Sequence, residues 1–206
     1  DPDLSYDGDG TLVKGSPRDW SIYGKGEYRK NPRLILPHYK ETIIEPPFHA
    51  IGVDFGYSSP MAAVGLRRFG VPNQNPRAEF KELYYKTGQD TSDLIESLKR
   101  FKGVPIFCDS AEPDRIKQMR KAGLDARKAR KKVEAGLDAL RQHTIWLDAH
   151  SPNLLAEAEE YTRQKGSDKP VKENDHIMDA ARYALLSLTT GDDDRSFATT
   201  MRILNR

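Results

Sequence analysis

The stretch that decides the fold is Phe48-His49-Ala50-Ile51-Gly52-Val53-Asp54-Phe55-Gly56. Its apolar run ends in an aspartate with a glycine two residues later, a pattern that predicts a buried strand followed by a sharp turn. A second apolar run, Val104-Pro105-Ile106-Phe107-Cys108-Asp109, also ends in an aspartate. If the two strands are adjacent and parallel, Asp54 and Asp109 lie side by side at the carboxyl edge of a sheet, where open α/β folds bind ligands.

A third carboxylate, Asp179, lies in the segment Asn174-Asp175-His176-Ile177-Met178-Asp179-Ala180-Ala181-Arg182-Tyr183-Ala184. The apolar residues of this segment recur at helical spacing, which predicts a helix with a buried face. The small residues Ala180 and Ala181 allow this helix to pack closely on the sheet. His176 and Asp179 are three residues apart and therefore share a face. For Asp175 we favour a helix cap over a metal ligand.

Converging carboxylates point to metal chemistry. Like charges in close contact raise each other's pKa unless a cation binds between them. Hard oxygen ligands suit Mg²⁺ or Mn²⁺, and two such ions can drive phosphodiester hydrolysis. Taken singly, each aspartate also fits a turn residue or a helix cap, so the spacing alone leaves the structural interpretation open beside the metal site.

The remaining pattern predicts an α/β fold, with a mixed central sheet flanked by helices. The predicted strands cover about 48–54, 60–69, 78–86, 104–109 and 144–147, and the predicted helices about 91–101, 112–121, 131–142, 152–164 and 175–188. Residues 20–47 are broken by prolines and indicate irregular strands or a hairpin.

The composition of the chain excludes several classes of structure and of binding partner. The chain has 206 residues, 37% of them hydrophobic, with a net charge of only +2 and a single cysteine, Cys108. One cysteine excludes an internal disulfide framework and a multi-thiolate zinc cluster. We see no signal peptide and no apolar stretch of transmembrane length, so no membrane partner is expected.

Basic residues are concentrated in one region, because residues 115–132 carry nine Lys or Arg against one acid. We expect residues 126–132 to form a mobile loop that contacts DNA phosphates with little sequence preference. A solvated helix face is the alternative. The candidate DNA-binding residues are Arg127, Lys128, Arg130, Lys131 and Lys132.

At these motifs the chain resembles the C-terminal nuclease domain of the large terminase subunit of tailed bacteriophages. The resemblance covers about residues 20–188 and is carried by the segment ending in Asp54-Phe55-Gly56, by Cys108-Asp109-Ser110-Ala111-Glu112-Pro113, and above all by residues 175–184. It implies a ribonuclease H-like fold and a metal-dependent endonuclease that cuts concatemeric double-stranded viral DNA during packaging. It also implies that Asp54, Asp109 and Asp179 hold two Mg²⁺ or Mn²⁺ ions, with His176 as a further catalytic residue near them.

The resemblance also implies partners and a place of action: the terminase ATPase domain, the small terminase subunit, the portal protein and the host cytoplasm. The chain lacks the Gly-x-x-x-x-Gly-Lys-Ser/Thr phosphate loop of the ATPase motor. It begins Asp1-Pro2, and we expect it to be the nuclease part of a longer protein. The expected division is a linker or flexible extension over 1–19, the nuclease domain over 20–190 and a tail over 191–206.

Three alternatives remain open. Asp54 with Glu79-Phe80-Lys81 imitates another nuclease arrangement, although it leaves Asp109 and Asp179 without a role. A nuclease of the same fold that resolves four-way junctions is a second alternative. A third is a DNA-binding or motor-regulating module whose catalysis has lapsed, which the intact set of three acids disfavours.

Overall fold

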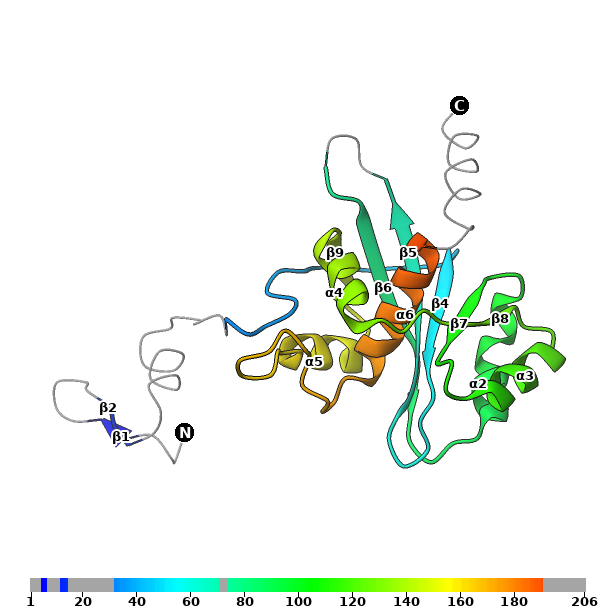
Figure 1. The fold of residues 1–206 in the computed structure, drawn as a ribbon, viewed down its shortest axis with the longest axis horizontal. Coiled ribbons are helices and arrows are strands. Elements are labelled where there is room, and N and C mark those ends of the chain that lie inside the picture. The colour runs from blue at the N-terminus through cyan, green and yellow to red at the C-terminus, as the bar shows by residue number, and fades with distance from the viewer. Residues whose placement is uncertain (1–4, 7–11, 15–31, 71–73, 191–206) are drawn as a thin grey trace.

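Seven strands of the described residues form one mixed sheet, in the order β3-β9-β6-β5-β4-β7-β8 (Figure 1). The computed structural model describes residues 5–6, 12–14, 32–70 and 74–190. The strands of this sheet are β3 (Lys40–Thr42), β4 (Ala50–Asp54), β5 (Met61–Phe69), β6 (Arg77–Lys86), β7 (Ile106–Cys108), β8 (Ala126–Lys128) and β9 (Thr144–Asp148). Two short strands, β1 (Ser5–Tyr6) and β2 (Leu12–Lys14), pair antiparallel with each other.

The centre of the sheet is an antiparallel meander, and parallel strands extend it on both sides. β4 pairs with β5 and β5 with β6, both antiparallel. β7 and then β8 add in parallel beside β4, while β9 and then β3 add in parallel beside β6. Parallel neighbours require crossover connections, so the chain leaves the sheet and returns through helices. The mixed α/β sheet predicted from the sequence is therefore confirmed.

Helices cover both faces of the sheet. One face carries α2 (Thr91–Leu98), the 3₁₀ helix η2 (Lys99–Phe101) and α3 (Pro113–Lys121), and the other carries α4 (Val133–Arg141), α5 (Pro152–Glu160) and α6 (His176–Thr190). Successive residues of β4 feed the two cores, because Ile51 and Val53 pack with α2 and α3 whereas Ala50 packs with α4 and α6. Burial on both faces explains why this strand is an unbroken apolar run.

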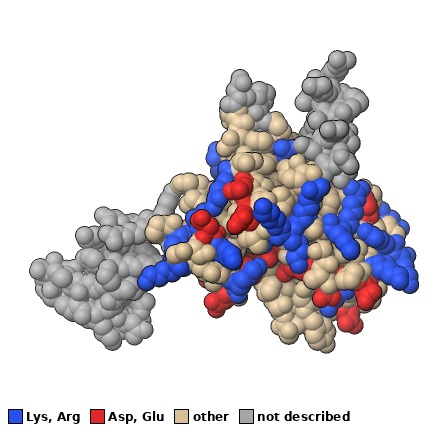
Figure 2. Space-filling model, viewed as in Figure 1, with Lys and Arg blue, Asp and Glu red and all other residues tan. Residues whose placement is uncertain are grey.

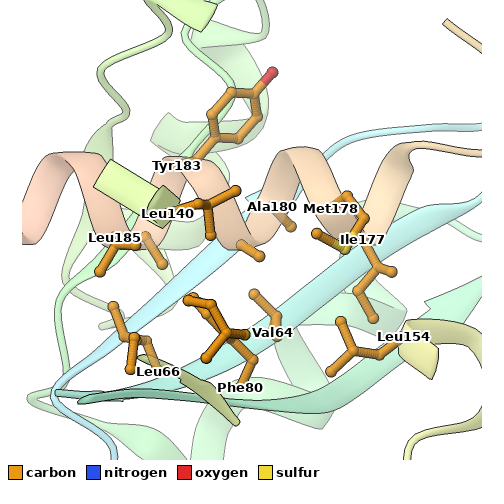
Figure 3. Close-up of a cluster of buried hydrophobic side chains, with 14 of the residues drawn as sticks. Val64, Leu66, Phe80, Leu140, Leu154, Ile177, Met178, Ala180, Tyr183 and Leu185 are labelled. Carbon is orange, nitrogen blue, oxygen red and sulfur yellow. The ribbon is translucent and has the colours of Figure 1, made fainter. Parts of the chain in front are cut away.

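Helix α6 is the central helix of the second layer, between the sheet and α4 (Figure 1). All of its residues from Ile177 to Leu188 are buried. Figure 3 shows Ile177 and Leu185 on the side of α6 that faces Val64 and Phe80 of the sheet. A helix covered on both sides needs apolar residues around most of its circumference, which its sequence supplies.

Most predicted elements are confirmed, with boundaries shifted by a few residues. The helix predicted over 91–101 is α2 followed by η2. Asp90 and Asp93 form a capping box at the start of α2. The helix predicted over 152–164 ends at Glu160 instead. It stops because Tyr161 is drawn into pairing elsewhere: its carbonyl oxygen accepts a hydrogen bond from the N–H of Ile35 at 2.8 Å.

One strand of the seven-stranded sheet was missed. Residues Ala126–Lys128 were predicted to belong to a mobile loop, but they form β8, which pairs in parallel with β7. The loop prediction was wrong for these residues because an edge strand needs few apolar side chains. Only Ala126 of β8 is buried, at 2% exposure, so the sequence carries little strand signal.

Few residues near the two ends of the chain are described. Within 20–47, the described residues from 32 onward include β3, whose partner is the distant β9 rather than a hairpin neighbour. The linker or extension predicted for 1–19 lies outside the described residues, apart from β1 and β2, and so does the predicted tail over 191–206. In the part of the chain that is described, no helix combines the length and apolarity required to cross a membrane.

Candidate active site

Asp54 and Asp109 each follow the end of a strand, as the sequence predicted, and these two strands are adjacent and parallel. Val53 of β4 is in register with Cys108 of β7, and each aspartate follows directly. The N–H of Asp109 donates to the carbonyl oxygen of Val53 at 3.0 Å, which ties the two strand ends together. The two carboxylates therefore leave the same edge of the sheet.

Asp179 reaches this edge from above, on the first turns of α6. Helix α6 contacts both β4 and β7, and Gly52 of β4 lies directly under Ala180. Asp179 is only 6% exposed, although it is a charged residue, and the residues next to it on the helix are apolar. A charged side chain at such a position must be paired, so its partners define the site.

The three carboxylates share one electrostatic neighbourhood. Burial raises the pKa of Asp54, and the negative charges of Asp179 and Asp109 raise it further, against the hydrogen bond from His176. Burial and the charges of the same three aspartates also raise the pKa of the Tyr183 hydroxyl. This is the situation of like charges held together, which a bound cation relieves.

His176, the first residue of α6, lies beside Asp54. Its Nδ1 is 3.3 Å from Asp54 Oδ2, slightly longer than a typical hydrogen bond. That hydrogen bond raises the pKa of His176 in spite of the opposing effect of burial. The residue predicted as a further catalytic residue is thus next to one of the three predicted metal ligands.

Both carboxylate oxygens of Asp179 are engaged by cations. Arg182, which is buried one helical turn later, pairs with Oδ1, and Lys172 Nζ lies 3.0 Å from Oδ2. Lys172 also lies 3.2 Å from Asp175 Oδ2. The sequence reasoning assigned no role to Arg182 or Lys172. Arg182 follows Asp179 by three residues on the same helix, a spacing that indicates an ion pair. Lys172 precedes the helix in a segment without periodicity, which carries no such signal.

Asp109 also forms an ion pair with a lysine. Lys131 Nζ lies 2.5 Å from Asp109 Oδ1, and its side chain is only partly exposed. Lys131 was predicted as a DNA-binding residue within the basic run, so its contact with a site carboxylate is a new finding. Two lysines, from separate segments, thus neutralise two of the three predicted metal ligands.

The other basic residues divide into two groups. Arg127 pairs with Asp125 at 2.7 Å. Lys128, Arg130 and Lys132 are exposed and make no ion pair within the described residues. The backbone N–H of Arg130 donates to Ser187 Oγ of α6 at 2.9 Å, which fixes this segment beside the site. The cationic surface is therefore built on an edge strand and an anchored connection.

Glu157 of α5 occupies the position expected for the cap of α6. Its Oε2 accepts hydrogen bonds from the N–H groups of Ile177 at 2.9 Å and Met178 at 3.2 Å, and its Oε1 accepts one from the Tyr85 hydroxyl at 2.7 Å. These are the two N–H groups that a residue at position 175 would cap. The favoured role of Asp175 as the cap was therefore wrong.

The donor set of the site fits divalent magnesium or manganese. Asp54, Asp109 and Asp179 supply hard oxygen ligands, and Asp175 Oδ2 lies 3.2 Å from the Lys172 ammonium that also contacts Asp179. Among the described residues, no group of three or more Asp, Glu, His or Cys side chains is placed closely enough to hold a metal ion as it stands. Lys131 and Lys172 instead provide positive charge at Asp109 and Asp179.

The alternative arrangement through Glu79-Phe80-Lys81 is not supported. On β5, Asp54 is paired with Ala62, whereas Glu79 is paired with Arg67, five residues further along the strand. Glu79 is also buried in ion pairs with Arg67 and Arg77. Its carboxylate is therefore neutralised at a distance from Asp54.

No protein-family model and no curated sequence matches the chain. Solved structures do match it. The large terminase of a thermophilic bacteriophage, solved in complex with ADP, superposes with a TM-score of 0.59 and 22% identity over 74% of this chain. The chain spans 43% of the length of that terminase.

Two isolated nuclease domains match over almost their whole length. The P22 large terminase nuclease domain gives a TM-score of 0.58 with 18% identity, covering 71% of this chain and 90% of the domain. The large terminase nuclease domain of bacteriophage SPP1, solved with bound Mn, gives 0.57 with 22% identity, covering 71% of this chain and 93% of the domain. The chain therefore has the fold of the large terminase nuclease domains, which is ribonuclease H-like.

Proposed function

We propose that this protein is a metal-dependent endonuclease that cuts concatemeric double-stranded viral DNA during genome packaging. The observation that carries the proposal is the shared electrostatic environment of three carboxylates: Asp54 and Asp109 end adjacent parallel strands, and the charges of Asp179 and Asp109 both raise the pKa of Asp54. The likeness to nuclease domains of large terminases, one of them solved with bound Mn, supports the same interpretation.

In this proposal each carboxylate has a distinct role. Asp54, between the other two, would contact both of two Mg²⁺ or Mn²⁺ ions, while Asp109 would hold one ion and Asp179 the other. Bound ions supply Lewis-acid activation of water and stabilisation of the leaving 3′ oxygen. His176 would take the proton of the attacking water or orient that water, because its ring stands beside Asp54.

The cationic surface would hold the substrate. Lys128, Arg130 and Lys132 are exposed next to the site and free to contact phosphates, and Lys131 would join them when a cation replaces it at Asp109. Phosphate contacts carry no direct sequence information, so cleavage should show little sequence preference. The proposed partners are duplex DNA, the terminase ATPase domain, the small subunit and the portal protein, acting in the host cytoplasm.

Plasmid nicking tests the proposal. Supercoiled DNA should be nicked and then linearised by the chain in Mn²⁺ or Mg²⁺, and should remain intact in excess chelator. Asp54→Asn should be inactive, whereas Asp138→Asn, an exposed position on α4, should cut like the parent. Cleavage in chelator, or full activity of Asp54→Asn, would refute the proposal. A strong preference for four-way junctions over linear duplex would instead indicate a junction-resolving nuclease.

A further inference from the structure

A cleft of about 350 Å³ opens beside the carboxylates, a volume typical of ligand sites. One wall is the start of α4 and the other is the segment 161–172, which precedes α6 and to which the sequence assigned no function. The residues that line the cleft are Lys132, Val133, Glu134, Gln164, Lys169, Pro170 and Lys172.

The second wall is a braced hairpin. Arg163 and Pro170 form an antiparallel bridge, and the N–H of Val171 donates to the carbonyl oxygen of Thr162 at 2.8 Å. The N–H of Gln164 donates to the carbonyl oxygen of Lys169 at 2.9 Å. Because these hydrogen bonds fix the backbone of the hairpin, the wall of the cleft is formed before a ligand arrives. Binding would therefore not carry the entropic cost of ordering this segment.

The lining suits the backbone of DNA. Lys132 and Lys169 stand on opposite walls, and neither forms an ion pair within the described residues. Glu134 is the single acid among the lining residues, against three lysines. Val133, Pro170 and the lysine stems add apolar surface. Phosphates match the lysines and deoxyribose matches the apolar surface. Figure 2 shows Lys and Arg side chains spread across this face of the molecule, with acidic side chains interspersed among them.

Lys172 joins the cleft to the carboxylate site. It lines the cleft, its side chain is 59% exposed, and its ammonium is shared between Asp175 and Asp179. A flexible four-carbon stem lets that charge move when its partners change.

Resting on the nuclease function proposed above, we propose that this cleft binds the phosphate backbone of one strand of the DNA duplex, next to the scissile position. Lys172 takes part in two states. It neutralises Asp175 and Asp179 when no divalent cation is bound. When cations bind those carboxylates, their charge displaces the ammonium, which turns to a phosphate in the cleft.

Binding of a short labelled duplex to the full chain tests this by fluorescence anisotropy over a salt series, once in chelator and once in Ca²⁺, a hard cation that binds oxygen ligands. Each lost phosphate contact lowers the slope of log K against log salt by about 0.9. Lys132→Ala and Lys169→Ala should each show this loss in both conditions. Lys172→Ala should show it in Ca²⁺ only. The matched control is Lys117→Ala, an exposed lysine of α3 on the other face of the sheet, which should leave the slope unchanged.

Unchanged slopes in normally folded Lys132→Ala and Lys169→Ala would overturn the cleft as a DNA site. A loss in Lys172→Ala that is equal with and without Ca²⁺ would overturn the exchange of partners. The nuclease proposal is scored separately by nicking: metal-dependent nicking that Asp54→Asn abolishes would stand even if the cleft variants bind like the parent. Slope losses in a chain that never nicks DNA would leave the cleft as a DNA site and refute the nuclease.

Discussion

A Cβ atom at Gly52 would lie 1.8 Å from the carbonyl oxygen of Ala180. The backbones of β4 and α6 thus touch directly, with no side chain between them. Asp54 follows Gly52 by two residues and Asp179 precedes Ala180 by one, so this contact sets how far apart the two carboxylates stand. The candidate site depends on a glycine that carries no chemistry itself.

Gly52→Ala should therefore disrupt both stability and the site. The new methyl meets backbone rather than a side chain that could rotate away, so we expect destabilisation at or above the upper end of overpacking, about 3 kcal/mol. Gly70→Ala is the control, because a Cβ there meets nothing within 4 Å. Thermal or urea unfolding of the two variants measures the difference. Equal stability of Gly52→Ala and the parent would show that α6 can shift without cost.

Asp179 and His176 should separate by metal binding. Asp179→Asn removes a charge that the proposed ion requires, so both Mn²⁺ binding and nicking should fall to background. His176→Ala should bind Mn²⁺ like the parent but cut about 10²–10⁴-fold more slowly, the usual size of an acid–base contribution. Calorimetric Mn²⁺ titration and single-turnover cleavage check this. If His176→Ala also lost Mn²⁺ binding, the imidazole would be a ligand.

Glu157 should make stability depend on pH. Burial raises the pKa of Glu157 from 4.5 to about 7, against the hydrogen bonds from Tyr85, Met178 and Ile177. A carboxyl whose folded pKa is raised is protonated more readily in the folded state, so its stabilisation is complete below pH 4.5 and is lost as pH rises through 7. From pH 5 to pH 8 the parent should lose roughly 2.5 kcal/mol relative to Glu157→Gln.

Urea unfolding of the parent and Glu157→Gln at several pH values measures this difference, and other titrating groups cancel in the comparison. The amide is a fair reference because its oxygen can still accept from the N–H groups of α6. Parallel pH profiles for the two proteins would contradict the prediction and indicate a carboxylate that stays ionised throughout.

Lys131 should compete with divalent cations. Because its ammonium neutralises Asp109, Lys131→Ala should bind Mn²⁺ more tightly than the parent. A partly exposed ion pair is worth up to about 1 kcal/mol, which corresponds to roughly a fivefold lower Kd. In chelator the same variant should be slightly less stable, and Mn²⁺ should raise its Tm more than that of the parent. Lys128→Ala, exposed and without such a contact, is the control. Weaker Mn²⁺ binding by Lys131→Ala would mean that the lysine supports the metal site.

The buried strands could be predicted from the sequence, whereas the edge strand and most side-chain contacts could not. The runs ending in Asp54 and Asp109 were predicted as strands, which is confirmed, and the register of β4 with β7 shows that they are adjacent and parallel, the condition under which their carboxylates lie side by side. These elements are buried on both faces, so their apolar pattern is dense. Edge strand β8 was missed because its pairing is made by backbone groups, which are the same in every residue and leave little trace in the pattern.

The partners of the carboxylates lay further out of reach. Glu157 caps α6 from a different helix, Lys131 reaches Asp109 across 22 residues of chain, and Lys172 approaches Asp179 from an irregular hairpin. Nothing in local periodicity relates such residues, because their contacts arise only when separate elements pack.

By itself the sequence determined the α/β class, the strand ends that carry Asp54 and Asp109, and the helix that carries Asp179, because burial and backbone period are written into the order of apolar residues. Only the tertiary structure decided which charges neutralise these carboxylates, which residue caps α6 and where a cationic cleft opens. Those features depend on side chains brought together across the sheet, where distance in space is independent of distance along the chain.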